Sequence, residues 1–269
     1  MSSSASSGTA TAPSTSTVGT FGWYELHTRD RTRAADFYGQ LIGWTTSSQG
    51  PYTGLLTSSG AYAGGMMDMP QGVPSEVPAH WVVYLRVADV DAAAARVAGL
   101  GGQLIVPPHD VPNVGRMCTI ADSTGATLQL FKGVSDKTPE MGPGTFCWTE
   151  LLSHDPAKAK SFYASLVGWS TTSMPLPTGE YTMFWTPNAN PETMQGCAGG
   201  MMKIAPEWGP MPSCWLSYIH VADVDATAAR IEPLGGTIFC PPTDIPNIGR
   251  FAVASDPTGA MFAIYMAKR

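Results

Sequence analysis

The hydrophobic and polar positions of the first hundred residues follow two different periods in turn. Residues 21–28 (FGWYELHT) alternate as a half-buried β-strand does. Asp30 is a good helix cap, and apolar side chains then recur at helical spacing over residues 34–41 until Gly43 ends the pattern. Short runs rich in β-forming residues follow at about 44–48, 52–57 and 61–68. Together these segments predict a βαβββ module.

The same pattern then begins again. A strand over residues 80–87 (HWVVYLRV) leads to the cap Asp89, to a helix with apolar residues on one side over 90–100, and to a stop at Gly101 and Gly102. Three further strands end in ATLQLFKG. Two βαβββ modules in succession are therefore predicted.

The second half of the chain repeats the first. FGWYELHTRD (21–30) returns as FCWTELLSHD (146–155), and VADVDAAAARVAGLGG (87–102) returns as VADVDATAARIEPLGG (221–236). An insertion at about 175–197 contains TPNANPETMQ, which is typical of an exposed turn. The predicted fold class is α+β, with four βαβββ modules in two tandem domains. The predicted divisions are a disordered Ser/Thr-rich tail (1–19), domain 1 (20–134), a polar linker (135–144) and domain 2 (145–269).

A mixed, curled sheet with its helix on one face leaves the other face free to wrap a ligand. Four such modules can pair within one chain, so a monomer is feasible. A dimer is also compatible with the sequence, which leaves the oligomeric state open.

Composition narrows the class of partner. The chain has a formal net charge of −6, 13% charged residues and no cluster of Lys and Arg, which argues against a nucleic-acid partner. No apolar run approaches the roughly 20 residues that cross a bilayer, so no membrane partner is expected. The five cysteines are scattered, and their odd number argues against a disulfide framework and suits the reducing cytoplasm. A small-molecule partner is therefore favoured.

The motifs DFYGQLIGW, V-x-D-V-D-A and D-x-x-G-A, together with the module count, resemble the vicinal oxygen chelate superfamily. Its members include glyoxalase I, bleomycin resistance proteins, fosfomycin-resistance enzymes and extradiol dioxygenases. FCWTELL and D-[VI]-P-N-[VI]-G-R are similar to its tandem two-domain branch. The resemblance covers nearly everything after residue 20. It implies two glyoxalase-like domains, each able to form one pocket.

The resemblance also implies a metal site with one ligand from each of four strands. The first-strand position falls on Trp23 and Trp148, which cannot bind a metal. The other positions fall on Val82 and Leu216, on Gln129 and Ala263, and near the Gly and Met residues of GGMM. A divalent ion prefers imidazole and carboxylate ligands here. No metal or other cofactor is therefore expected.

Strand alternation identifies the side chains that share the face of these positions. Beside Trp23 and Trp148 they are Glu25, His27 and Glu150; beside Val82 and Leu216 they are Tyr84, Arg86, Tyr218 and His220. The approximate two-fold that relates the modules in this superfamily would place Glu25 opposite Tyr84 and Glu150 opposite Tyr218. A desolvated carboxyl group beside a tyrosine hydroxyl suits acid–base chemistry or the orientation of a ligand. The alternative is that the two groups only satisfy each other.

The remaining aromatic, methionine and basic residues divide between core and pocket. Four tryptophans are predicted in the core: Trp44, Trp81, Trp169 and Trp215. Trp23, Trp148 and the methionine pairs Met66-Met67 and Met201-Met202 are predicted in the pocket walls, where flat or adaptable side chains suit planar ligands. Arg116 and Arg250, in the repeated D-x-P-N-x-G-R motif, either anchor a turn or reach an anionic ligand. Three histidines are predicted to be solvated: His80, His109 and His154.

The leading functional hypothesis is a metal-free binder of an apolar or aromatic small molecule, with a role in metabolite or antibiotic binding, sequestration or a biosynthetic pathway. The candidate ligand-binding residues are Trp23, Trp148, His27, Arg86, Gln129, Met66, Met201, Val82 and Leu216. The alternative is an enzyme, either a glyoxalase-like lyase or isomerase or a metal-dependent dioxygenase whose ligands have moved. Its candidate catalytic residues are Glu150, Tyr218, Glu25, Tyr84 and His220. A protein-interaction module, based on the insertion, is a third hypothesis.

Overall fold

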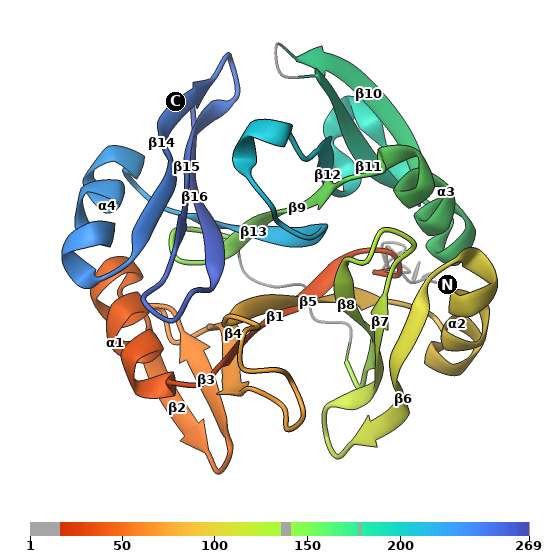
Figure 1. Cartoon of the computed structure of the whole chain (residues 1–269), viewed down its shortest axis with the longest axis horizontal. Helices are drawn as coiled ribbons and strands as arrows, with labels where there is room; N and C mark the ends of the chain where they lie inside the picture. The colour runs from red at the N-terminus through yellow and green to blue at the C-terminus, as the bar shows by residue number, and fades with distance from the viewer. Residues whose placement is uncertain (1–16, 136–140, 177–178, 269) are drawn as a thin grey trace, which may run out of the picture.

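The computed structural model describes residues 17–135, 141–176 and 179–268, which form two similar halves (Figure 1). The first half contains β1 (Phe21–Thr28), α1 (Arg31–Ile42), β2 (Thr45–Gln49), β3 (Tyr52–Leu56), β4 (Tyr62–Asp68), β5 (His80–Arg86), α2 (Val90–Val97), β6 (Gln103–Val111), β7 (Gly115–Ala121) and β8 (Thr127–Gly133). The second half contains β9 (Phe146–Ser153), α3 (Pro156–Val167), β10 (Ser170–Leu176), β11 (Gly179–Asn190), β12 (Gln195–Lys203), β13 (Cys214–His220), α4 (Val224–Ile231), β14 (Thr237–Ile245), β15 (Gly249–Ser255) and β16 (Met261–Ala267). Short 3₁₀ turns complete these elements. The four predicted βαβββ modules are all present.

Each half folds into one eight-stranded mixed sheet. The strand order is β2-β3-β4-β1-β5-β8-β7-β6 in the first sheet and β10-β11-β12-β9-β13-β16-β15-β14 in the second. The first strands of paired modules meet antiparallel in the middle, β1 with β5 and β9 with β13. Each of these central strands also pairs in parallel with the last strand of its own module, as β1 does with β4. The residues of β1, β5, β9 and β13 therefore lie at the centre of their sheets.

The helices form where the sequence places a cap and an apolar stripe. Asp30 accepts a hydrogen bond from the Arg33 amide at 2.9 Å and so begins α1. The buried residues of this helix are Ala34, Phe37, Tyr38 and Leu41, which form the predicted stripe. In the second half Asp155 plays the same part at α3, and Pro156 occupies the first helical position.

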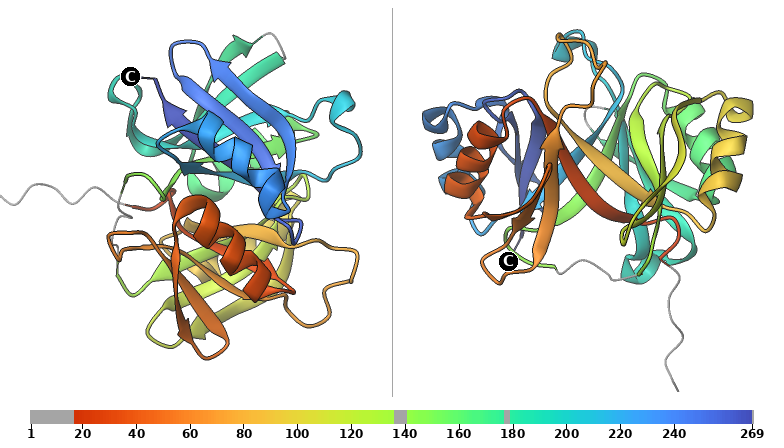
Figure 2. Two further views of the ribbon diagram at one scale, coloured as in Figure 1. Left: turned by 90° about the vertical axis from the view of Figure 1, so that its left-hand side faces the viewer. Right: turned by 90° about the horizontal axis from the view of Figure 1, so that it is seen from below.

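Helices from the two halves lie side by side. Figure 1 and Figure 2 show α1 next to α4 on one flank and α2 next to α3 on the other. One continuous hydrophobic core joins the helix-covered faces of both sheets and contains Trp44, Trp81, Trp169 and Trp215, as predicted. Within this core the Tyr24 ring, from the first half, stacks on Phe146, from the second, with centroids 4.0 Å apart. The two halves therefore share one hydrophobic core.

The Tyr24 hydroxyl also bonds the Thr149 hydroxyl across the halves at 2.7 Å. Two indoles add a symmetric pair of contacts, because Trp44 Nε1 donates to the Gly144 carbonyl and Trp169 Nε1 to the Gly19 carbonyl. Hydrogen bonds and aromatic packing therefore both connect the first half of the chain to the second across this interface.

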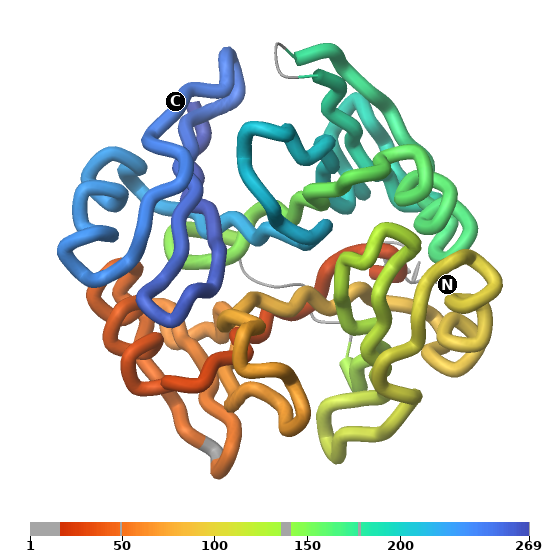
Figure 3. Tube along the Cα trace, viewed as in Figure 1, coloured from red at the N-terminus to blue at the C-terminus, as the bar shows by residue number. Residues whose placement is uncertain are grey.

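The insertion is more ordered than predicted. β11 continues to Asn190 and pairs with β12 through Asn190 and Gln195, so much of the expected loop is a longer hairpin. The Cα tube in Figure 3 follows the chain through both halves in the view of Figure 1. Backbone pairing is available there because both segments continue from neighbouring strands. The predicted tail lies outside the described residues except for 17–19. Within the described parts of the chain, no helix is long and apolar enough to cross a membrane.

Candidate functional site

The face of each sheet that carries no helix, here called the open face, bears Trp23, Trp148 and both predicted Glu–Tyr pairs. On the first sheet Val82, Tyr84 and Met117 form a small apolar cluster with Trp23 and Phe131 packed against it. The cluster on the second sheet is larger and includes Leu152, Leu216, Tyr218 and Ala263, with Trp148 and Met202 beside them. Both Trp23 and Trp148 are only half-buried. They therefore lie where the sequence predicted them, away from the helix-side core.

The prediction that Met66 and Met201 line a pocket is wrong. Both side chains are buried in the helix-side core. The physical reason is the two-residue period of a strand, which sends adjacent methionines to opposite faces. The next methionine in the second half, Met202, is the one that packs on the open face.

In the first half, Glu25 is the centre of a hydrogen-bond cluster. Its Oε1 accepts from the Tyr84 hydroxyl at 2.9 Å and bonds His27 Nε2 at 2.8 Å. Tyr52 also contacts this carboxyl group, and its hydroxyl accepts from the indole Nε1 of Trp23 at 2.9 Å. Glu25 and His27 are both buried. The predicted pairing of Glu25 with Tyr84 is thus observed, and His27 belongs to the same cluster.

In the second half, Glu150 has a similar arrangement without the histidine. The Tyr218 hydroxyl donates to Glu150 Oε2 at 2.8 Å. Tyr181 contacts the same carboxyl group and accepts from the Trp148 indole at 2.9 Å. Leu152 stands where the first half has His27. Each half therefore contains the same series of contacts, Trp–Tyr–Glu–Tyr.

Sequence reasoning missed Tyr52 and Tyr181, which come from β3 and β11. The register places Tyr52 opposite Met67 and Tyr181 opposite Met202, two residues along from the glycines of GGMM. The repeated Tyr-Thr pair in the two copies, at 52–53 and 181–182, was the available signal.

The glycines explain how these tyrosines reach the carboxyl groups. A Cβ on Gly65 would lie 1.8 Å from the Tyr52 hydroxyl, and one on Gly200 would lie 2.0 Å from the Tyr181 hydroxyl. Each phenol ring therefore occupies the space that a side chain on β4 or β12 would fill. Because Gly65 is the register partner of Glu25, and Gly200 of Glu150, the hydroxyl arrives beside the acid.

Burial changes the acidity of this cluster. It raises the pKa of Glu150, although the hydrogen bonds from Tyr218 and Tyr181 act in the opposite direction. Burial and the charge of Glu150 together hold the pKa values of Tyr181 and Tyr218 well above their ordinary range. The tyrosines therefore remain phenols that donate hydrogen bonds. A carboxyl group whose pKa is raised by burial, in contact with two phenols, is the kind of group that a general acid or base requires.

Three further predicted residues, Gln129, Arg86 and His220, differ in where they lie relative to the two clusters. Gln129 is buried on the open face beside Tyr84, and its Oε1 accepts from the Thr119 hydroxyl at 3.2 Å. Arg86 lies against Gly22, where an added Cβ would be 2.6 Å from its Nε. Among the described residues, His220 is not one of the hydrogen-bond partners of Glu150.

His80 is half-buried, so it is less exposed to solvent than predicted. Its ring packs edge-on against His27 with centroids 5.5 Å apart, and burial lowers its pKa. His109 and His154 are exposed, as predicted.

The repeated arginines anchor turns. Arg116 bonds Asp91 at the start of α2 and Asp110, and Arg250 bonds Asp225 and Asp244 in the same way. Their guanidinium groups are therefore already committed to carboxylates of this chain.

The residues present do not fit the divalent metal that the superfamily implies. Within the described residues, no group of three or more His, Cys, Asp or Glu side chains is placed to hold a metal ion. Glu25 and His27 bond each other, and the indoles of Trp23 and Trp148 carry no lone pair for a metal. The relocated sets of Glu25, His27 and Gln129, or of Glu150 and His220, do not supply a tetrahedral or octahedral shell. No chemical step is therefore assigned to a metal.

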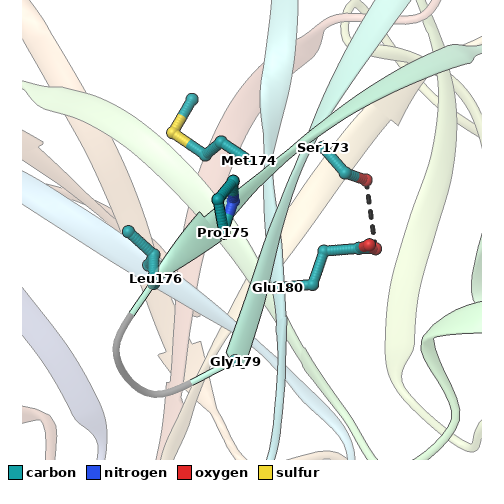
Figure 4. A pocket seen from close by; sticks show the side chains of 6 residues that line it. All are labelled: Ser173, Met174, Pro175, Leu176, Gly179 and Glu180. Atoms are coloured by element: carbon teal, nitrogen blue, oxygen red, sulfur yellow. Dashed lines mark hydrogen bonds between the residues drawn. The ribbon is translucent and has the colours of Figure 1, made fainter.

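One surface hollow lies away from these clusters. It has a volume of about 310 Å³ and is open to solvent at the tip of the β10–β11 hairpin (Figure 4), lined by Ser173, Met174, Pro175, Leu176, Gly179 and Glu180. Glu180, its one charged group, already bonds Ser173 and Lys160. A second hollow of about 240 Å³ lies beside Arg29 and Arg33. Neither contains a buried reactive group, so we place the candidate site on the open faces.

Comparison with known proteins gives consistent matches over both halves. The model of the Glyoxalase/Bleomycin resistance protein/Dioxygenase superfamily matches residues 20–130 and 145–264. The candidate glyoxylase CFP32 of Mycobacterium tuberculosis is 36% identical over 255 residues, which cover 91% of this chain and 94% of CFP32. The anthracycline biosynthesis protein DnrV of Streptomyces peucetius is 33% identical over 260 residues, which cover 90% and 91%.

Solved structures with much lower sequence identity share the fold. The Mn(II)-bound glyoxalase from Novosphingobium aromaticivorans has a TM-score of 0.64 at 14% identity, covering 93% of this chain and 82% of that one. The 2,3-dioxygenase LapB from Pseudomonas sp. KL28 has a TM-score of 0.62 at 11% identity, covering 94% of each chain.

Proposed function

The chain belongs to the Glyoxalase/Bleomycin resistance protein/Dioxygenase superfamily, and from that premise we propose that it binds a flat, largely apolar small molecule on an open face, without a metal ion. The observation that carries this proposal is the Trp–Tyr–Glu–Tyr arrangement, which both halves contain. A buried carboxyl group is costly to desolvate, so its presence at the same position in both halves supports a functional role.

The chemistry of the open face indicates the class of ligand. The half-buried indoles of Trp23 and Trp148 offer flat apolar surface, and the carboxyl groups with their tyrosines offer a few fixed polar atoms. Two relatives are anthracycline biosynthesis proteins, and anthracyclines contain a flat fused-ring system. A polycyclic aromatic metabolite is therefore the ligand class that we assign, and the role is binding, sequestration or assistance in its biosynthesis.

A fluorescence titration tests the proposal. 2-Hydroxyanthraquinone should quench the tryptophan emission of the protein in a saturable way. The double variant Glu25→Gln/Glu150→Gln should bind about 10- to 100-fold more weakly, because each substitution removes a charged hydrogen-bonding partner. The matched control is Glu76→Gln/Glu192→Gln, which changes one exposed carboxyl group in each half and should bind as the wild type does. Equal binding by both double variants would refute the proposal.

A glyoxalase-like lyase or isomerase is the second candidate. The observation that favours it is Glu150, whose pKa burial raises, in contact with two phenols that can stabilise an oxyanion. The relative CFP32 is named as a candidate glyoxylase, which supports the same class of activity. Turnover of the hemithioacetal of methylglyoxal and a small thiol, measured on metal-free protein and lost in Glu150→Gln, would establish this activity. Saturable binding of the anthraquinone without turnover of the hemithioacetal would exclude this activity and support the proposed binding function.

A further inference from the structure

The two halves differ in how many hydrogen bonds their central carboxyl group, Glu25 or Glu150, accepts from the protein. In the first half, Glu25 Oε1 is bonded by both His27 and Tyr84, and Tyr52 adds a third contact. In the second half, Leu152 replaces the histidine and supplies no donor. A carboxylate can accept about four hydrogen bonds. Glu150, which is just as buried, therefore keeps more unused capacity than Glu25.

The surrounding side chains differ in the same direction. Several polar residues on the first open face correspond to less polar ones on the second: His80 to Cys214, Gln129 to Ala263 and Thr119 to Val253. Cys214 does not replace the missing donor, because burial and the charge of Glu150 raise its pKa to about 11 and leave a thiol, which donates weakly. The first open face is therefore polar and internally bonded, and the second is apolar around one carboxyl group.

This difference decides where a ligand gains most. A molecule on the first face would have to displace the 2.8 Å bond between His27 and Glu25 before it could use the carboxyl group. On the second face, a ligand hydroxyl would add a hydrogen bond that the protein itself leaves unmade. The apolar cluster around Tyr218 would cover the rest of the ligand.

We propose that the second half holds the single working site, that this site takes a flat aromatic molecule carrying one hydroxyl group aimed at Glu150, and that His27 blocks the corresponding site of the first half. This inference rests on the proposed function and adds the ligand's hydroxyl group and the location of its site.

Equilibrium dialysis with 2-hydroxyanthraquinone tests the inference through stoichiometry. The wild type should bind one equivalent per chain, and 2-methoxyanthraquinone, which has no donor, should bind at least about tenfold more weakly. Glu150→Gln should weaken the site by about 10- to 100-fold. Leu152→His should weaken it similarly, because the new imidazole would hydrogen-bond the Glu150 carboxyl group as His27 bonds Glu25. The matched control is Leu176→His, which places the same side chain at an exposed strand end.

The reciprocal variant His27→Leu keeps the inference testable if Leu152→His fails to fold. His27→Leu should release Glu25 and raise the stoichiometry from one to two equivalents per chain. Two equal sites in the wild type, or one site that Glu150→Gln leaves unchanged, would overturn the assignment to the second half while the proposed function stands. An unchanged stoichiometry in folded His27→Leu would overturn the blocking role. No saturable binding by the folded wild type would refute both proposals.

Discussion

Substitution of Gly200 by alanine should displace Tyr181 and break the contacts around Glu150. An ideal Cβ at this position would lie 2.0 Å from the Tyr181 hydroxyl oxygen and 2.5 Å from the ring carbon that bears it. Comfortable contacts between heavy atoms need about 3.5–4.0 Å. The ring must therefore move by more than an ångström, because both atoms belong to a rigid phenol and no small rotation clears them.

The magnitude follows from the bonds that the ring makes. The neutral bond from Trp148 Nε1, now 2.9 Å, contributes about 0.5–1.5 kcal/mol, and the contact with the carboxyl group about 1.5–3 kcal/mol. Replacing glycine by alanine within a strand returns about 0.5–1 kcal/mol. The free energy of unfolding should fall by about 1–4 kcal/mol.

Urea denaturation measures this change, with Gly99→Ala as the control. Gly99 is exposed and an added Cβ there meets nothing within 4 Å, so its replacement should not destabilise the protein. A double-mutant cycle then isolates the cause: in a Tyr181→Ala background, Gly200→Ala should cost almost nothing. A cost that persists without Tyr181, or a Gly200→Ala protein as stable as Gly99→Ala, would refute the reasoning.

Two further predictions concern the buried polar groups. Burial raises the pKa of Glu150 above its ordinary value of 4.5, so the folded chain holds this proton more tightly than the unfolded chain does. The stability of the wild type relative to Glu150→Gln should therefore fall as pH rises from about 4.5 through the raised pKa; urea titrations that show a constant difference across that range would contradict it. At the interface, Tyr24→Phe keeps the stacking on Phe146 but loses the 2.7 Å bond to Thr149, and should cost about 0.5–1.5 kcal/mol by the same assay, whereas the exposed Tyr62→Phe should cost nothing measurable.

Local sequence patterns were sufficient to predict much of the fold and, in each hydrogen-bond cluster, the glutamate and one of its two tyrosines. The caps at Asp30 and Asp155 and the two-residue period of β1 depend only on neighbours in sequence, and they placed Glu25 on the open face. The internal repeat supplied the rest, because paired modules had to bring Glu25 to Tyr84 and Glu150 to Tyr218.

Errors arose where the face of a residue, or its partner, depended on a neighbouring strand. The sequence-based prediction places both methionines of each pair in the pocket wall, but adjacent strand residues point to opposite faces, and the register of β4 on β1 sends Met66 to the helix-side core. His80 was expected in solvent because it begins a strand, but pairing with β1 brings it against His27.

The amino-acid sequence by itself determined the duplication, the order of strands and helices, and the positions of the carboxyl groups and their first tyrosines, because strand period, helix caps and repetition are local properties. Only the tertiary structure decided that Tyr52 and Tyr181 complete the clusters. Their rings reach the acids across Gly65 and Gly200, through space that exists only when three neighbouring strands are in register. It also showed that His27 bonds Glu25 while Glu150 has no such partner, a difference that depends on distances between side chains.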